Sequence, residues 1–288
     1  MASALSYMAE ETRRQDRDRF LCTLFAPEDA REGLFTLLAF NAEIAKSREV
    51  VSEPLLGEIR LQWWRDAIER IYADPAGNFD DHAIVAGVAK IINHDNLSRS
   101  LFDQLINARS RDMIDEPPKN DTELREYAVG TVGRLNALML ELLQPSGTQR
   151  SENLAEASEH VSVAWALTGI IRASSILSKY KRIFMPQSLM QDCGFDTYTF
   201  QAQKPTPEIR SAIKHMVEIA RAEIGQARSK LGGKIDKRYR AIFLQASLAE
   251  LFLNRIENRD FNPFDVKIEK GRAGRQMMLT FKAVRGSF

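Results

Sequence analysis

The stretch that decides the fold is residues 169–186, with the sequence GIIRASSILSKYKRIFMP. It continues a helical pattern of apolar residues that begins at Val161. The helix is expected to end a few residues before Pro186, because the residue before a proline is sterically pushed out of the helical region. On the helical repeat, one face carries Gly169, Arg172, Ala173, Ile176 and Leu177. This face therefore presents one cation and no carboxylate.

The composition is that of an ordinary globular protein. A chain of 288 residues is long enough to bury a substantial core, and its 27% of charged residues is typical of a water-soluble surface. A net charge of +1, without a supporting motif, argues against a nucleic-acid-binding protein. Cys22 and Cys193 have no metal-ligand spacing and are expected to be reduced thiols. No signal peptide and no run of roughly 18 apolar residues is found, which predicts a cytoplasmic location.

Helical spacing of apolar residues runs through most of the chain, and no segment alternates at period two. Helices are predicted at about residues 4–25, 27–51, 54–73, 82–93, 98–113, 121–143, 153–178, 208–231 and 237–259, with an irregular stretch from 187 to 207. Because the connections are short, we expect one all-α domain over residues 1–288.

The helix that starts at Pro54 carries apolar residues at helical spacing. Leu55, Ile59 and Trp63 are predicted to point inward with Ile68 and Ile71, while most of the charged residues point outward. The adjacent Trp63 and Trp64 are interpreted as core packing rather than as a ligand platform.

Several strings of the chain, taken in order, resemble the squalene/phytoene synthase family over about residues 16–265. They are DRDRF (16–20), LAFNAEIA (38–45), LQWW (61–64), Asp112, Tyr127 and Gly133 in the intervening helices, Arg172, and RIFMP (182–186). The resemblance implies an all-α isoprenoid synthase-like helical bundle around a central cavity. Enzymes of this family join two prenyl diphosphates head to head, using Mg²⁺ ions held by carboxylate clusters on two facing helices.

The six positions where the resemblance places those carboxylates hold Ala45, Lys46, Glu49, Ala173, Ile176 and Leu177. Five of the six lack a carboxylate, and a lysine occupies one metal-ligand position. Glu43 and Glu49 are six residues apart, on different helix faces, so they do not form a shifted cluster. We therefore expect no metal and no cofactor; Mg²⁺ would be needed only if other acids formed a rearranged site.

The pattern of departures is similar to a divergent branch of the family that contains assembly factors for respiratory complex I. The shared strings are FNAEIA (40–45), RLQWWR (60–65), ARSRD (108–112) and FNPFD (261–265). This resemblance implies a non-enzymatic helper, peripheral to an inner membrane, whose partner is a membrane protein subunit or an assembly intermediate. Two alternatives stay open: a prenyl-diphosphate transferase with a rearranged site, and an isoprenoid- or lipid-binding protein that keeps the cavity.

Four cations are candidates for a metal-free anion site that would bind a diphosphate or a lipid headgroup: Lys46, Arg48, Arg172 and Arg182. The competing interpretation is that Lys46 and Arg48 pair with Glu43, Glu49 or Asp112, and that Arg172 is a structural hydrogen-bond donor.

The C-terminal tail, residues 267–288, combines six cations with apolar residues and a single acid, Glu269. Such a tail suits an anionic membrane surface or a groove on a partner. It equally suits a tail that packs its apolar residues on the body of the protein and leaves its charges in water. The sequence does not decide between these interpretations.

Overall fold

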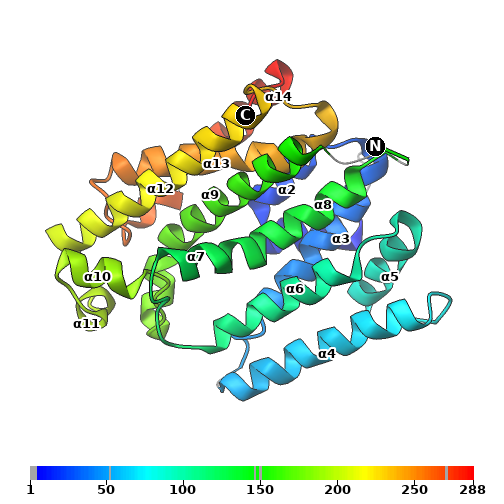
Figure 1. Cartoon of the computed structure of the whole chain (residues 1–288), viewed down its shortest axis with the longest axis horizontal. Helices are drawn as coiled ribbons and strands as arrows, with labels where there is room; N and C mark the ends of the chain where they lie inside the picture. Colours follow the sequence, from blue (N-terminus) through cyan, green and yellow to red (C-terminus); the bar gives the residue numbers. More distant parts are fainter. Residues whose placement is uncertain (1–4, 52, 146, 149–150, 270–271) are drawn as a thin grey trace.

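The computed structural model describes residues 5–51, 53–145, 147–148, 151–269 and 272–288. Over these residues the protein is a bundle of helices joined by short connections (Figure 1). The described residues form no strand, and they contain one isolated β-bridge, between Lys234 and Ser287. The predicted all-α fold is therefore confirmed.

The first half of the bundle consists of α1 (Tyr7–Gln15), α2 (Arg17–Thr23), α3 (Glu28–Ala45), α4 (Pro54–Ala73), α5 (Ala83–Asp95), α6 (Arg99–Arg109), the 3₁₀ turn η1 (Ser110–Met113), α7 (Asp121–Ala128), the π-helical turn η2 (Val129–Gly133) and α8 (Arg134–Leu143). The second half consists of α9 (Glu152–Leu177), η3 (Ser178–Tyr180), α10 (Gln187–Cys193), α11 (Thr197–Gln201), α12 (Pro207–Leu231), η4 (Lys237–Tyr239), α13 (Arg240–Glu257), η5 (Val266–Glu269) and α14 (Arg272–Arg285).

Three predicted segments differ from the structure. The single helix expected over 4–25 is two helices, because the Asp16 side chain accepts a hydrogen bond from the Arg19 amide (3.0 Å) and caps α2. Helix α3 ends at Ala45 rather than near residue 51. The stretch expected to be irregular after Pro186 contains α10 and α11.

Residues 121–143 form the continuous helical run that the sequence predicts, but with the π-helical turn η2 in its middle. At Gly130 the backbone passes very close to α6, where an added Cβ atom would lie 2.8 Å from the Cβ of Ala108. A glycine is needed there because any side chain would push the two helices apart. The π turn also directs Thr131 and Val132 toward the cavity described below.

Helix α9 is the centre of the bundle. It packs against α12 and α13 on one side and α8 on the other, and Figure 1 shows it between α12 and α8. Residues 152–180 form the one described segment long and apolar enough by composition to cross a membrane, and 61% of its most apolar window is buried inside the molecule. Its apolar character is thus used in packing neighbouring helices.

The prediction for α4 was wrong at its N-terminal half. Leu55, Ile59 and Trp63 are 68%, 57% and 43% exposed, whereas Trp64 is buried against Phe40. The helix lies at the edge of the bundle (Figure 1), where α6, η1 and α3 pack against it and part of its surface stays exposed. A helix that is apolar on two faces gives an ambiguous pattern, and the close approach of Gly57 to Met113 selects the buried face.

The tail is partly packed. Lys270 lies outside the described residues, and α14 follows it. Leu279, Ala283 and Phe288 are buried on the body of the protein, as one of the two interpretations requires. The opposite side of α14 remains exposed, so packing accounts for only part of the tail's apolar residues.

Candidate functional site

The face of α9 singled out by the sequence lines two adjoining cavities. The α3–α9 cavity, of about 220 Å³, is lined by Ala45 at the end of α3, by Glu49 in the turn that follows, and by Ala173 and Leu177 from α9. The α2–α9 cavity, of about 480 Å³, is lined by Arg172 and Ile176 together with residues of α1, α2, η5 and α14. Trp165, Gly169 and Ala173 line both cavities. The structure therefore brings four of the six predicted metal-ligand positions into one cavity and Ile176 into the next.

Lys46, the remaining position, is turned toward acids of α1 and α3. Its Nζ atom lies 2.7 Å from Glu43 Oε1 and 3.4 Å from Glu11 Oε1. Burial opposes the charge of Glu11, but hydrogen bonds from Gln15 and Arg14 and the charge of Lys46 lower its pKa. The lysine charge is thus neutralised locally.

Arg48 and Glu49 follow Lys46 in the turn after α3. Arg48 lies 3.5 Å from Asp115 and donates to the Val51 carbonyl (3.3 Å). Glu49 is exposed; its amide donates to the Lys46 carbonyl (2.9 Å), and its carboxylate makes no hydrogen bond or ion pair with any other residue that the structure describes.

A buried cluster that we call the Asp112 cluster borders the α3–α9 cavity; it consists of Asp112, Arg109, Tyr127 and Arg182. The Tyr127 hydroxyl donates to Asp112 (2.7 Å), and the guanidinium groups of Arg109 and Arg182 each lie 3.5 Å from its carboxylate. Burial, followed by the charge of Asp112, raises the pKa of Tyr127 well above its ordinary value. Both oxygens of Asp112 are therefore occupied by donors from within the protein.

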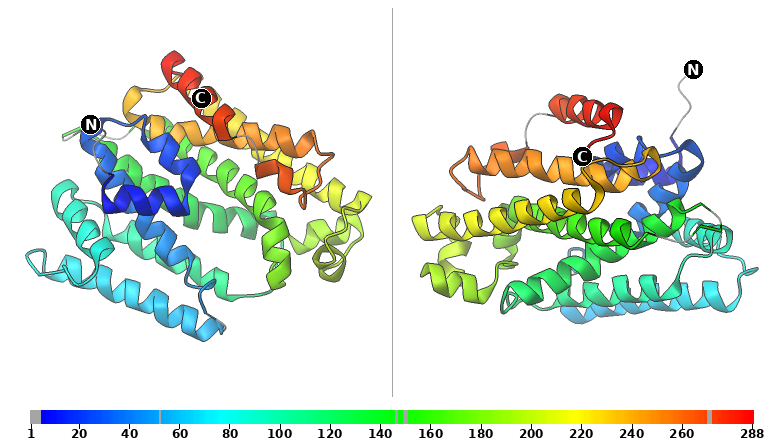
Figure 2. Two further views of the ribbon diagram at one scale, coloured as in Figure 1. Left: turned by 180° about the vertical axis from the view of Figure 1, so that it is seen from behind. Right: turned by 45° about the horizontal axis from the view of Figure 1, so that its top comes forward.

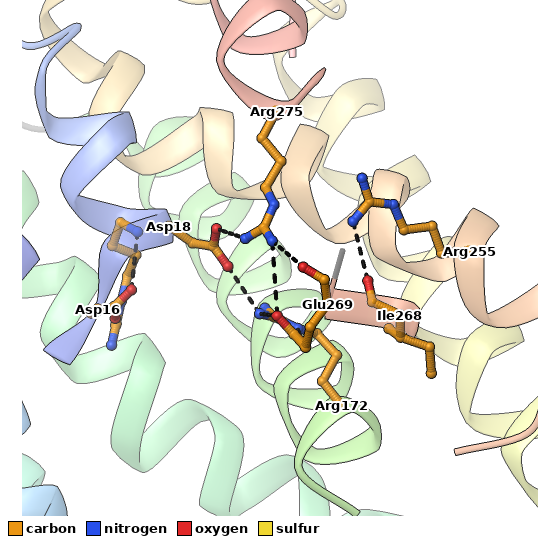
Figure 3. Close-up of polar contacts among 8 residues, drawn as sticks. Asp16, Asp18, Arg172, Arg255, Ile268, Glu269 and Arg275 are labelled. Atoms are coloured by element: carbon orange, nitrogen blue, oxygen red, sulfur yellow. Dashed lines mark hydrogen bonds and ion pairs between the residues drawn. The ribbon is translucent and has the colours of Figure 1, made fainter. Parts of the chain in front are cut away.

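A second set, the Asp18 cluster, borders the α2–α9 cavity and consists of Asp18, Arg172, Glu269 and Arg275 (Figure 3). Arg172 donates to Asp18 (2.9 Å) and to Glu269 (2.6 Å). Arg275 donates to Asp18 (2.6 Å) and to the Glu269 carbonyl (2.5 Å). The cluster joins α2, α9, η5 and α14, which are far apart in sequence.

The charges of the Asp18 cluster stabilise one another. Burial opposes the charged form of Arg172, but Glu269 and Asp18 raise its pKa above the ordinary value. Burial likewise opposes the Glu269 carboxylate, but Arg172 lowers its pKa below the ordinary value. The Arg172 guanidinium also lies 3.6 Å from the centroid of the Phe252 ring, a cation–π contact. Arg172 is thus held by partners on several sides.

The four cations proposed as an anion site occupy separate places. Lys46 and Arg48 pair with acids of their own surroundings, and Arg172 and Arg182 belong to different clusters. Sequence reasoning did not single out Asp18, Arg109 or Arg275 as members of a site. The one available signal was Glu269, a lone acid within a basic tail.

The comparisons with known proteins agree with this architecture. Residues 12–276 match the family model described as squalene/phytoene synthase. Over 264 residues the chain is 27% identical to the human protein "NADH dehydrogenase (ubiquinone) complex I, assembly factor 6", covering 92% of this chain and 77% of that protein. The chloroplastic phytoene synthase of Narcissus pseudonarcissus is 23% identical over 208 residues, covering 71% of this chain and 48% of that enzyme.

Two solved structures show the same fold at low sequence identity. The squalene synthase HpnC from Alicyclobacillus acidocaldarius superimposes with a TM-score of 0.76 at 20% identity, covering 89% of this chain and 94% of that one. A dehydrosqualene synthase crystallised with a ligand gives a TM-score of 0.83 at 14% identity, covering 97% of this chain and 94% of that one. The predicted isoprenoid-synthase fold is thereby confirmed.

Proposed function

Because the chain belongs to the squalene/phytoene synthase family, we propose that it is a non-catalytic member that assists the assembly of respiratory complex I. Its partner would be a membrane protein subunit or an assembly intermediate of that complex. Two observations support the proposal: the names of curated relatives that match 92% of this chain, and the chemistry of the cavity walls.

The observation that carries the proposal is the poor fit of the cavity residues to Mg²⁺. Mg²⁺ prefers six oxygen ligands in near-octahedral geometry. Of the six positions expected to hold carboxylates, only Glu49 offers one. Asp112 lies in the same cavity, but Tyr127, Arg109 and Arg182 already surround its oxygens. Among the described residues no group of three or more His, Cys, Asp or Glu side chains is placed to hold a metal ion.

The arginines of the site are poorly suited to take over from a metal. Arg172 is bound by two carboxylates, and Arg182 lies against a third. A diphosphate would have to displace Asp18 or Glu269 before it could bind Arg172. This internal neutralisation weighs against both the transferase and the diphosphate-binding alternatives.

The cavities weigh against a prenyl ligand as well. Cavities that hold drug-sized ligands are roughly 300–1,000 Å³, and the α3–α9 cavity is about 220 Å³. The larger α2–α9 cavity, about 480 Å³, has walls that include Arg14, Asp16, Arg17 and Asp18. Charged walls of this kind suit a hydrocarbon chain badly.

The proposal is tested by deleting the gene in its own organism and measuring complex I. We expect less assembled complex on native gels and a lower NADH:ubiquinone oxidoreductase activity in isolated membranes, with other respiratory complexes unchanged. The wild-type gene should restore both readouts.

A matched variant separates assembly from catalysis. Glu49→Gln removes the one carboxylate at the expected metal-ligand positions, and Glu49 is exposed, so folding should be unaffected. We expect this variant to restore complex I as well as the wild type does. Normal complex I in the deletion strain, or failure of Glu49→Gln to complement while the protein accumulates normally, would contradict the proposal.

A further inference from the structure

Helix α14 is attached to the molecule by one face only. Leu279 and Ala283 on that face are buried, and Arg275, one turn earlier, belongs to the Asp18 cluster. After the helix, the ring of Phe288 is buried in the core, with Arg228 donating to the Phe288 carbonyl (2.8 Å). Because residues four apart share a helix face, these contacts fix how α14 is rotated about its axis.

The opposite face of α14 is apolar and exposed. Met277, Phe281 and Val284, spaced by four and three residues, are 75%, 53% and 80% exposed. In Figure 2 α14 is the outermost helix on its side of the bundle. Exposed apolar residues are common on protein surfaces, and α4 carries a similar row, so the charges around the α14 row decide what this face could bind.

Cations flank this apolar row. The Arg285 guanidinium lies 4.0 Å from the centroid of the Phe281 ring, and Lys282 is half-buried beside it. The one acid between residues 267 and 288 is Glu269, which is engaged in the Asp18 cluster. The outer side of the tail is therefore positive without a compensating carboxylate of its own.

The loop after α12 adds further positive charge next to the end of α14. The Ile235 amide donates to the Gly286 carbonyl (3.0 Å), which ties this loop to the tail. Lys234 in this loop and Lys237, the first residue of η4, are exposed. The acid between them, Asp236, uses its carboxylate to cap the following turn.

We propose that the exposed row of α14 and the neighbouring cations form a contact surface for an anionic lipid bilayer. Met277, Phe281 and Val284 would enter the boundary between headgroups and acyl chains, and Arg285, Lys234 and Lys237 would face the lipid phosphates. Interfacial helices combine these two features, and neither alone gives stable attachment. At 14 residues α14 is about 21 Å long, too short to span a hydrocarbon core of about 30 Å. In this arrangement α14 lies along the surface of the bilayer and does not cross it.

This inference deepens the proposed function by naming the surface through which the chain would reach a membrane-embedded partner. It rests on that function only for the biological setting, because the lipid contact is argued from the tail alone. The two proposals therefore have separate readouts: complex I in cells for the function, and lipid vesicles in vitro for the contact.

The test is sedimentation of the full-length purified protein with vesicles of phosphatidylcholine, with and without phosphatidylglycerol. We expect binding to the anionic vesicles, weakened by salt, and little binding to the neutral ones. The double change Met277→Ser with Val284→Ser should reduce binding about tenfold or more. Arg285→Gln with Lys237→Gln should also reduce binding about tenfold or more, since each cation near the surface contributes roughly fivefold.

The α4 residues provide a matched control. Leu55→Ser with Ile59→Ser removes two similarly exposed apolar side chains elsewhere on the surface, and should leave vesicle binding unchanged. All variants are first compared with the wild type by thermal unfolding. No binding to anionic vesicles, or equal loss in the α4 and α14 variants, would overturn the proposal. If the α14 variant keeps vesicle binding but lowers complex I in cells, the face contacts a protein, and the lipid assignment is wrong.

Discussion

The Asp112 cluster and the Asp18 cluster contain the same kinds of side chain but join different parts of the molecule. Each places a buried aspartate between two arginines, and each borders a cavity lined by Trp165, Gly169 and Ala173. The Asp112 cluster joins η1, α6, α7 and the turn after α9, all part of the core of the bundle. The Asp18 cluster reaches across 257 residues of sequence to hold the tail. The Asp112 cluster connects helices inside the bundle, whereas the Asp18 cluster attaches the peripheral helix α14 to it.

The largest loss of stability is expected from a change in the Asp112 cluster. Asp112→Ala would leave the buried guanidinium groups of Arg109 and Arg182 without a carboxylate. Breaking a buried ion pair by removing one partner costs about 3–5 kcal/mol, so the free energy of unfolding, measured with urea, should fall by about that much. Tyr127→Phe, which removes one hydrogen bond to the same carboxylate, should cost only about 1 kcal/mol. Equal losses in the two variants would show that Asp112 is not the centre of the cluster.

A smaller and more local effect is expected from Asp18→Ala. Arg172 and Arg275 would keep their contacts with Glu269, so the loss should be about 1.5–3 kcal/mol, the range for hydrogen bonds to charged groups. The loss should appear first in α14, as faster amide hydrogen exchange there than in α9. Asp16→Ala, two residues earlier in the same DRDRF segment, should instead fray the start of α2. Uniform exchange across both helices would contradict the assignment of the cluster to the tail.

Lowering the pH should weaken the attachment of α14 through the Asp18 cluster. The pKa of Glu269 is lowered in the folded protein, so its unfolded state binds a proton more readily. Its stabilisation is therefore complete above the unfolded value of 4.5 and is lost as the pH falls through the lower folded value. In urea titrations from pH 3 to pH 7, the difference between wild type and Glu269→Gln should be present at pH 6 and should shrink below about pH 4.5. A difference that grows as the pH falls below 4.5 would contradict this sign.

The smallest effect is expected at Lys46, where the cation is partly exposed and pairs with Glu43 and Glu11. Lys46→Ala should change the free energy of unfolding by about 0.2–1 kcal/mol, as for other accessible ion pairs. It should not create Mg²⁺ binding, because the neighbouring Ala45, Ala173 and Leu177 still offer no oxygen. Calorimetry with MgCl₂ measures this directly, and saturable binding in the variant would show that Lys46 alone blocks a metal site.

Most of the fold could be predicted from the sequence, because the order of helices follows from a helical repeat that tertiary packing reinforces. The exceptions were local. In α4 two faces are apolar, and the buried one is the face on which Gly57 closely approaches Met113. The break at Asp16 depends on a cap that a continuous helical pattern hides.

The site could be predicted only in part. The resemblance placed Ala45, Glu49, Ala173 and Leu177 together, and the structure puts them around one cavity. The partners of Arg172 could not be foreseen, because Asp18 and Glu269 lie more than 90 positions from it in the sequence and meet it only in the folded chain. Charge pairing across such distances leaves no local pattern.

The most direct test of the central proposal is to incubate the purified full-length protein with farnesyl and geranylgeranyl diphosphate and to measure diphosphate release with Mg²⁺ and with a chelator. If the chain is a non-catalytic member of its family, release should equal the protein-free background in both conditions. Mg²⁺-dependent release that the chelator abolishes, and that Glu49→Gln removes, would contradict the account and establish a metal-dependent enzyme.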